Sequence, residues 1–244
     1  MRKSNRLSLN ILALSVATML FLPSVASCKT IDPANSGVYI GTSYGVGIAN
    51  KIGSHYKIDE GTYLPSEKPK NSRIFGLALG YKFNDNIRAE LALNRFHKFK
   101  FKPYLSATDK DNKTAHFYFD QKISASALFA NLYFDVNTFE KFTPYISLGI
   151  GYSRNKSGDL NLTTKQDGEG DERGITNKSD SYNKFAYNVG AGIAYKLNDK
   201  VFLEVVNYKY YNLGKVITKP DDDNDRMIAK LSVHSINTGI RFQF

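Results

Sequence analysis

The chain has 244 residues, a formal net charge of +10 at pH 7, 16 Tyr, 16 Phe and no Trp. Its polar mean hydropathy argues against a bundle of membrane-spanning helices, and its single cysteine excludes an internal disulfide. This length fits one large β domain or two small domains.

The first 27 residues have the layout of a secretory signal peptide. A basic start precedes an apolar stretch, 7–22, and small residues lead to Ser27. We expect residues 1–27 to be removed on export; a retained membrane anchor is the alternative. Cys28 follows the predicted cut, so "VASC" fits both ordinary cleavage and the lipidation motif of bacterial lipoproteins. We favour ordinary cleavage, which leaves residues 28–36 as a short periplasmic segment.

After this segment the dominant pattern is an alternation with a period of two, which is typical of β-strands. One face is rich in Val, Ile, Leu, Tyr and Phe, and the other in Gly, Ser, Asn and isolated charges. The pattern recurs eight times, which predicts strands near residues 37–50, 73–83, 87–96, 124–136, 143–153, 185–197, 201–213 and 230–244.

The seventh of these runs changes parity. Its apolar face includes Val205 in the first half but Tyr208 in the second half, which shifts the alternation by one residue. We therefore predict a β-bulge between Val205 and Tyr208.

The links between the predicted strands alternate between short and long. Short turns, "NDN", "NTFEKF" and "NDK", join the second strand to the third, the fourth to the fifth and the sixth to the seventh. The other four links are long and polar, near residues 50–71, 97–119, 154–182 and 212–229. Because both chain ends lie on the short side, this asymmetry favours an even-stranded transmembrane barrel.

A soluble β-sandwich would also contain alternating strands. The barrel is favoured because the apolar faces are nearly continuous and suit lipid, while the glycines of the other face help to fill a narrow lumen. On a sandwich those glycines would face water and weaken the strands. Charges on the glycine-rich face can pair inside a barrel. The candidate lumen charge network comprises Lys82, Arg88, Glu90, Glu204 and Arg241.

The signal peptide and the motifs "GVYIGTSYGVG", "TPYISLGIGYS" and "GIRFQF" resemble small bacterial outer-membrane barrels of the opacity or surface-antigen family. The resemblance extends to members from rickettsia-like intracellular bacteria and covers the mature chain. It implies residence in the cell outer membrane and insertion by the barrel-assembly machinery, which reads a C-terminal aromatic, here Phe244. Without Trp, tyrosines must form the interface girdle. The girdle candidates are Tyr44, Tyr81, Tyr152, Tyr187 and Tyr195.

Eight strands enclose a lumen just wide enough for side chains to fill it, so we expect no free diffusion pore. His234 and Ser235 are strand neighbours that point to opposite faces, so they cannot pair as base and nucleophile, and no enzyme is expected. The acidic stretch 221–225 lacks the central Gly and closing Glu of a calcium loop. We interpret it, like the Gly-rich stretch 165–174, as a solvated loop, and we expect no metal and no cofactor.

A basic stretch, "RFHKFKFKPY", interleaves cations with aromatics beyond the third predicted strand, at lipid headgroup height. Its cations could contact lipopolysaccharide phosphates or an anionic host polysaccharide. Alternatively, they are lysines that snorkel at the edge of the girdle. Export argues against nucleic acid as the partner. The candidate anion contacts are Arg95, Lys98, Lys100 and Lys102.

The sequence thus predicts an all-β protein: an eight-stranded antiparallel transmembrane barrel over residues 37–244, with four long extracellular loops and short periplasmic turns. The favoured function is that of an outer-membrane surface antigen, adhesin-like, acting through its loops on a host-surface ligand. The alternative is a structural or narrow-channel barrel that interacts with lipopolysaccharide or passes a small solute.

Overall fold

The computed structural model describes residues 36–50, 54–57, 71–102, 104–108, 114–136, 138–166, 172–177, 179–217 and 226–244. The chain divides into two units, Met1–Ile31 and Asp32–Phe244, and every described residue belongs to the second. The predicted signal peptide, Cys28 and the acidic stretch 221–225 lie outside the described residues, as do most of 28–36 and the middle of 165–174.

The described residues form β-strands joined by turns, and they contain no helix long and apolar enough to cross a membrane. The strands are β1 (Gly37–Ala49), β2 (Ser54–Lys57), β3 (Ser72–Lys82), β4 (Ile87–Phe101), β5 (Tyr104–Thr108), β6 (Thr114–Asp135), β7 (Phe142–Ser157), β8 (Leu160–Gln166), β9 (Glu172–Asn177), β10 (Asp180–Lys196), β11 (Val201–Ile217) and β12 (Arg226–Gln243).

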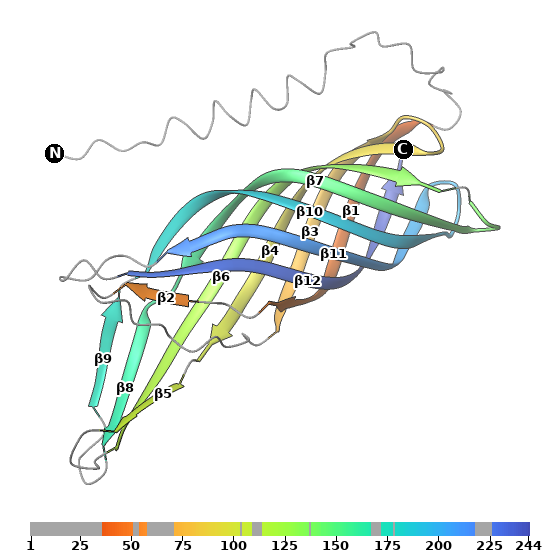
Figure 1. Cartoon of the computed structure of the whole chain (residues 1–244). Helices are drawn as coiled ribbons and strands as arrows, with labels where there is room; N and C mark the ends of the chain where they lie inside the picture. Colours follow the sequence, from red (N-terminus) through yellow and green to blue (C-terminus); the bar gives the residue numbers. More distant parts are fainter. Residues whose placement is uncertain are drawn as a thin grey trace, which may run out of the picture. The chain divides into compact units, whose positions relative to one another are not determined.

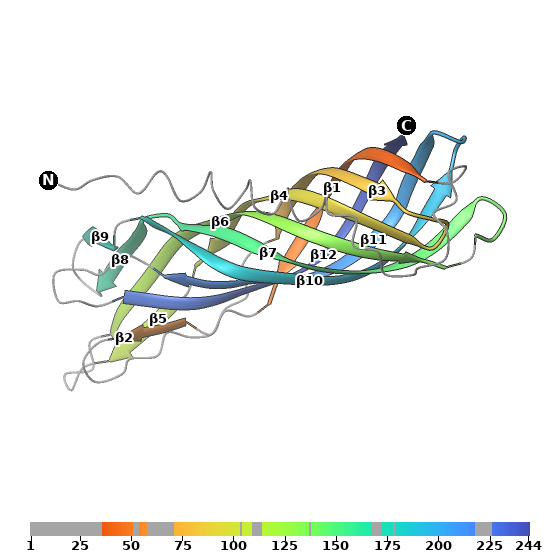
Figure 2. The ribbon, with the colours of Figure 1, turned by 90° about the horizontal axis from the view of Figure 1, so that it is seen from above.

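Eight of these strands close an antiparallel barrel in the order β1, β3, β4, β6, β7, β10, β11, β12 (Figures 1 and 2). The ring closes between the first and the last strand, where Tyr39 lies opposite Gln243 and Ala49 opposite Val233. The backbone N–H of Phe244 also donates to the carbonyl of Val38, at 2.9 Å. The predicted eight-stranded barrel is confirmed, and closure leaves neither terminal strand with an open edge.

The short turns are organised by asparagine side chains. Asn84 Oδ1 accepts hydrogen bonds from the backbone N–H groups of Asn86 and Ile87, both at 2.9 Å. Asn198 Oδ1 does the same for Lys200 at 3.0 Å and Val201 at 2.9 Å. Such Asx turns fix the chain reversal locally, as the sequence predicted for these links.

The predicted bulge in β11 is confirmed. Ile193 of β10 lies opposite Val206, whereas the next residue, Ala194, lies opposite Glu204, so Val205 is the extra residue. The side chains of Val205 and Val206 are both exposed on the outer wall. The bulge therefore keeps Glu204 inward before it and Lys209 inward after it.

The outer wall is apolar and the lumen is layered. Near the periplasmic turns the lumen is ionic, and near the other end it is filled by a cluster that we call the apolar plug. This cluster comprises Ala49, Ile74, Phe96, Phe99, Ile123, Ala125, Ala127, Phe129, Ala186, Tyr211, Leu213, Val216, Leu231 and Val233. Phe96 and Phe99 of the basic stretch do not face lipid, because both side chains point inward and are fully buried.

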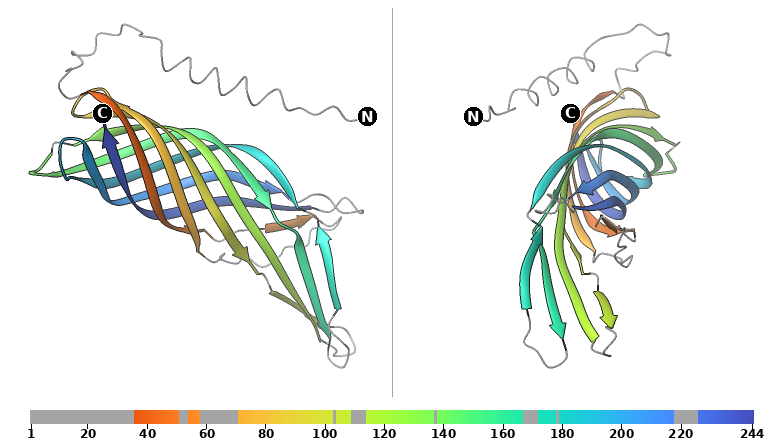
Figure 3. Two further views of the ribbon diagram at one scale, coloured as in Figure 1. Left: turned by 180° about the vertical axis from the view of Figure 1, so that it is seen from behind. Right: turned by 60° about the vertical axis from the view of Figure 1, so that its left-hand side comes forward.

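All four long links contain strand residues, and the loop reading of 97–119 and 154–182 is wrong for much of their length. β6 continues beyond the barrel and pairs with β5 on one side and β8 on the other, and β8 pairs with β9. We call β5, the outer part of β6, β8 and β9 the extracellular sheet (Figure 3). β2, in the link 50–71, pairs with β12.

Candidate functional site

Arg88 is the centre of the ionic layer in the lumen. Its Nε lies 3.0 Å from both carboxylate oxygens of Asp135, and its Nη1 lies 3.8 Å from Glu204 Oε1. Arg241 Nη1 approaches the same Glu204 oxygen to 3.6 Å. The two buried arginines thus share Glu204, and Arg88 also pairs with the buried Asp135. This compensates charges that would otherwise be strongly destabilising away from water.

Aromatic rings sandwich these cations. The Arg88 guanidinium lies 4.0 Å from the ring centroid of Tyr133 and 4.8 Å from that of Tyr145, whose hydroxyl also donates to Glu204. Arg241 stacks similarly, 5.2 Å from Tyr39 and 4.7 Å from Phe202. Cation–π contacts of this kind fix the guanidinium planes and fill the lumen at the same time.

Glu90 belongs to the same layer through hydrogen bonds. It accepts from the hydroxyls of Tyr39 at 3.2 Å and Tyr133 at 3.0 Å, and from Asn131 Nδ2 at 3.2 Å. Lys209 Nζ donates to the Tyr133 hydroxyl at 2.9 Å. Tyr133 therefore connects a buried lysine to a carboxylate.

The structure brings together four of the five residues expected in the lumen network and leaves one outside. Lys82 instead lies at the periplasmic end, 3.2 Å from Asp85 of the adjacent turn. Asp135 and Lys209 were missed. Both have inward parity in their strands, so the alternation itself could have identified them.

A layer of amides separates the ionic layer from the plug. Asn188 Nδ2 donates to Asn131 Oδ1 at 2.9 Å across Gly149, where a Cβ atom would collide with both amides. A cavity of about 50 Å³ lies between Arg88 and Tyr211 of the plug. This is far below the roughly 300 Å³ of a small ligand pocket. The described part of the lumen is a packed interior, and its chemistry is structural.

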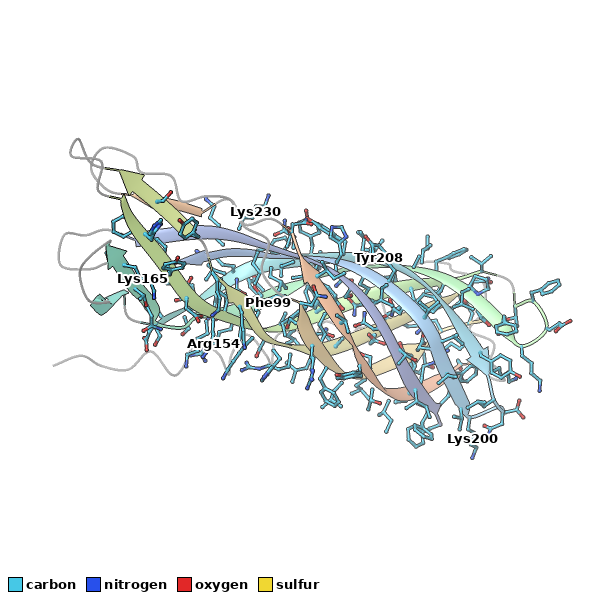
Figure 4. The ribbon with its side chains drawn as sticks, turned by 90° about the horizontal axis from the view of Figure 1, so that it is seen from below. Phe99, Arg154, Lys165, Lys200, Tyr208 and Lys230 are labelled. Carbon is cyan, nitrogen blue, oxygen red and sulfur yellow. The ribbon has the colours of Figure 1, made fainter. Side chains whose placement is uncertain are left out.

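The outer surface carries the other predicted contacts. Arg95, Lys98 and Lys100 of β4 are exposed, whereas Lys102 forms an ion pair with Asp120 at 2.8 Å. Arg95 donates to Ser126 of β6. Figure 4 shows the two ends of this surface, with Lys200 at the short turns and Lys165 on the extracellular sheet at the opposite end.

Further expectations concern His234 with Ser235, the terminal Phe244 and a metal site. His234 points outward, where its Nδ1 lies 2.7 Å from the Tyr208 hydroxyl, while Ser235 is buried inside and donates to the Lys209 carbonyl. They do not contact each other as base and nucleophile. The side chain of Phe244 is exposed at the periplasmic rim. Within the described ranges, no group of three or more His, Cys, Asp or Glu could hold a metal ion.

Comparison with known proteins agrees with this geometry. A family model described as "Outer membrane protein beta-barrel domain" matches residues 12–244. Outer membrane protein PagN of Salmonella typhimurium is 27% identical over 208 residues, which cover 80% of this chain and 82% of PagN. The protein named "Putative adhesin RP828" of Rickettsia prowazekii is 25% identical over 241 residues, covering 95% and 97% of the two chains.

A solved structure shares the fold. Neisserial surface protein A superposes with a TM-score of 0.52 at 16% identity, over 86% of this chain and 99% of the other. The closed barrel, its apolar outer wall and the match over nearly the whole chain have one explanation: this chain belongs to the outer-membrane β-barrel protein family and resides in the bacterial outer membrane.

Proposed function

We propose that the protein is an adhesin-like surface protein that binds a host-surface ligand through its extracellular sheet and performs no catalysis. Export by residues 1–27 and recognition of Phe244 by the barrel-assembly machinery are parts of the same proposal. The names of relatives such as RP828 support it. The packed lumen argues against the alternative of solute transport and leaves the outer surface as the place where a ligand binds.

The observation that carries the proposal is an exposed aromatic cluster on the extracellular sheet. Tyr104 of β5 and Tyr118 of β6 lie opposite each other with ring centroids 5.1 Å apart, and both side chains are exposed. The Tyr104 hydroxyl lies 2.6 Å from His116 Nδ1. Tyrosines held rigidly on strands are typical anchors of protein interfaces, because they bury a large area at a small entropic cost.

The register of the barrel allows this sheet to be removed cleanly. Phe101 lies opposite Gln121, and Ser157 lies opposite Asp180. Replacing residues 102–120 and 158–179 each with Asn-Gly therefore closes two hairpins with two-residue turns. We expect this variant to insert into the membrane as the wild type does and to lose binding to host cells, measured by counting adherent bacteria at equal surface expression.

A point variant and a control sharpen this test. Tyr104→Ser with Tyr118→Ser should reduce binding without removing the sheet. Phe139→Ser changes an exposed aromatic in a periplasmic turn and should leave binding unchanged. Heat-modifiable migration on unboiled gels checks that the double hairpin variant is a folded barrel. If this folded variant adhered as well as the wild type, the sheet would not be the binding surface.

A further inference from the structure

Cations gather on the outer wall where β6 leaves the barrel. They come from three neighbouring strands, β4, β6 and β7, and all point away from the lumen. Figure 4 labels one member of this set, Arg154. The set consists of Arg95, Lys98, Lys100, Lys122, Arg154 and Lys156.

Four of these cations line one open groove of about 400 Å³. Arg95 and Lys98 come from β4, Lys122 from β6 and Lys156 from β7. The groove also contains two carboxylates. The sequence pattern indicated only the β4 half of this surface, because the other half comes from strands that are distant in the chain.

The described lining of the groove carries more positive than negative charge, with four cations and two carboxylates. Lys100 lies directly opposite Lys122 on the neighbouring strand, an arrangement that destabilises a sheet. Of the two groove carboxylates, Asp120 is paired with Lys102 and Asp159 accepts the backbone N–H of Ser179 at 2.8 Å. Within the part of the chain that the structure describes, no carboxylate lies within ion-pair distance of Lys98, Lys122 or Lys156.

The groove lies at the extracellular edge of the apolar band on the outer wall. On each of the three strands, the next outward residue toward the periplasm is apolar and exposed. Leu93 follows Arg95 on β4, Leu128 follows Ser126 on β6, and Tyr152 follows Arg154 on β7. Cations at this step stand at the level of lipid headgroups. The cations of the groove are exposed on the outward face of the wall, and Asn161 of β8 lines the groove where it meets the extracellular sheet.

We propose that this groove binds the phosphate groups of lipid A, the phosphorylated glycolipid of the outer leaflet. The lysines and Arg95 neutralise the phosphates, and Ser124 adds a hydroxyl donor at the same wall. Lipid A phosphates thereby remove the repulsion between Lys100 and Lys122, and the base of β6 is held against the membrane. Lipid binding at these cations does not require a host ligand on the extracellular sheet.

The test compares lipids on the purified full-length barrel in nanodiscs. Binding of bisphosphorylated lipid A and of the same lipid stripped of its phosphates is measured by native mass spectrometry. We expect the wild type to prefer the phosphorylated lipid by roughly tenfold or more, since each cation near the surface contributes to headgroup attraction. The variant with Lys98→Gln, Lys122→Gln and Lys156→Gln should lose that preference.

The control variant carries Lys141→Gln, Lys196→Gln and Lys200→Gln at the periplasmic end, which removes the same charge, and it should keep the wild-type preference. Equal binding of both lipids by the wild type, or an unchanged preference in the groove variant, would overturn the proposal. Displacement of the lipid by a sulfated polysaccharide but not by inorganic phosphate would also overturn it and assign the groove to polysaccharide.

Discussion

Replacing Arg88 with Met should lower the free energy of unfolding by about 3–5 kcal/mol, because it leaves buried carboxylates without their partner. Arg88 is almost fully buried, and its Nε bonds both oxygens of Asp135 at 3.0 Å. Its loss also removes the cation between the rings of Tyr133 and Tyr145. Denaturant unfolding of the barrel in lipid vesicles, followed by gel mobility without boiling, measures the change.

Lys82→Met is the matched control for this effect. Lys82 forms its ion pair with the exposed Asp85 at the periplasmic turn, so its removal should change the stability by about 1 kcal/mol or less. Adding Asp135→Asn to Arg88→Met should recover part of the loss, since it removes one unpaired charge. Equal stability of the two single variants would show that the ionic layer does not hold the lumen together.

Replacing Phe96 with Ala should lower the free energy of unfolding by about 3–5 kcal/mol, as truncation of a buried Phe does in other well-packed cores. The side chain of Phe96 is fully buried in the plug, with its ring edge-on to that of Tyr211 at 5.1 Å. Its removal opens a cavity that neighbouring strands cannot close, because the hydrogen-bonded wall fixes their spacing. The same unfolding measurement in vesicles reports the loss.

Phe75→Ala is the corresponding control on the lipid side. Phe75 is about half exposed on the outer wall of the adjacent strand, where mobile lipid chains can refill the space. Its substitution should therefore destabilise the barrel less than Phe96→Ala. If the outward Phe mattered as much as the inward one, the apolar plug would not be a packed core.

The barrel itself was predictable because successive side chains of each strand point alternately to lipid and to the lumen, which gives the sequence a period of two. This parity also places Asp135 and Phe96 inward, since both alternate with exposed residues of the wall. Phe99 could not be placed in this way. The register of β4 against β6 shifts between Phe96 and Phe99, and this irregularity brings both rings to the same side of the wall.

The extracellular sheet was not predictable from the same signal. The outer part of β6 contains "AHFYF", and β8 reads "LNLTTKQ", where aromatic, polar and β-branched residues mix on both faces. In the outer part of β6, His116, Phe117, Phe119 and Asp120 are all half-buried, so burial here does not alternate between the two faces and leaves no period of two in the sequence. Its existence depends on β6 continuing past the barrel and offering two edges to its neighbours.

The basic groove could be predicted only in part from the sequence. Arg95 and Lys98 were singled out from one basic stretch, but Lys122 and Lys156 stand in segments with no unusual charge. Only the pairing of β4, β6 and β7 brings the four cations to one place. Lys82 is the opposite case. The alternation predicted that it points into the lumen, but its side chain reaches the adjacent turn and pairs with Asp85.

Planar-bilayer recording on the purified wild-type protein tests whether the barrel is a filled scaffold that acts through its outer surface. The plug, the amide layer and the ionic layer together leave a cavity of about 50 Å³ in the described lumen. We therefore expect no single-channel steps under conditions in which a porin of known conductance gives them. Reproducible steps from the wild type, at the same size in repeated preparations, would contradict a closed lumen.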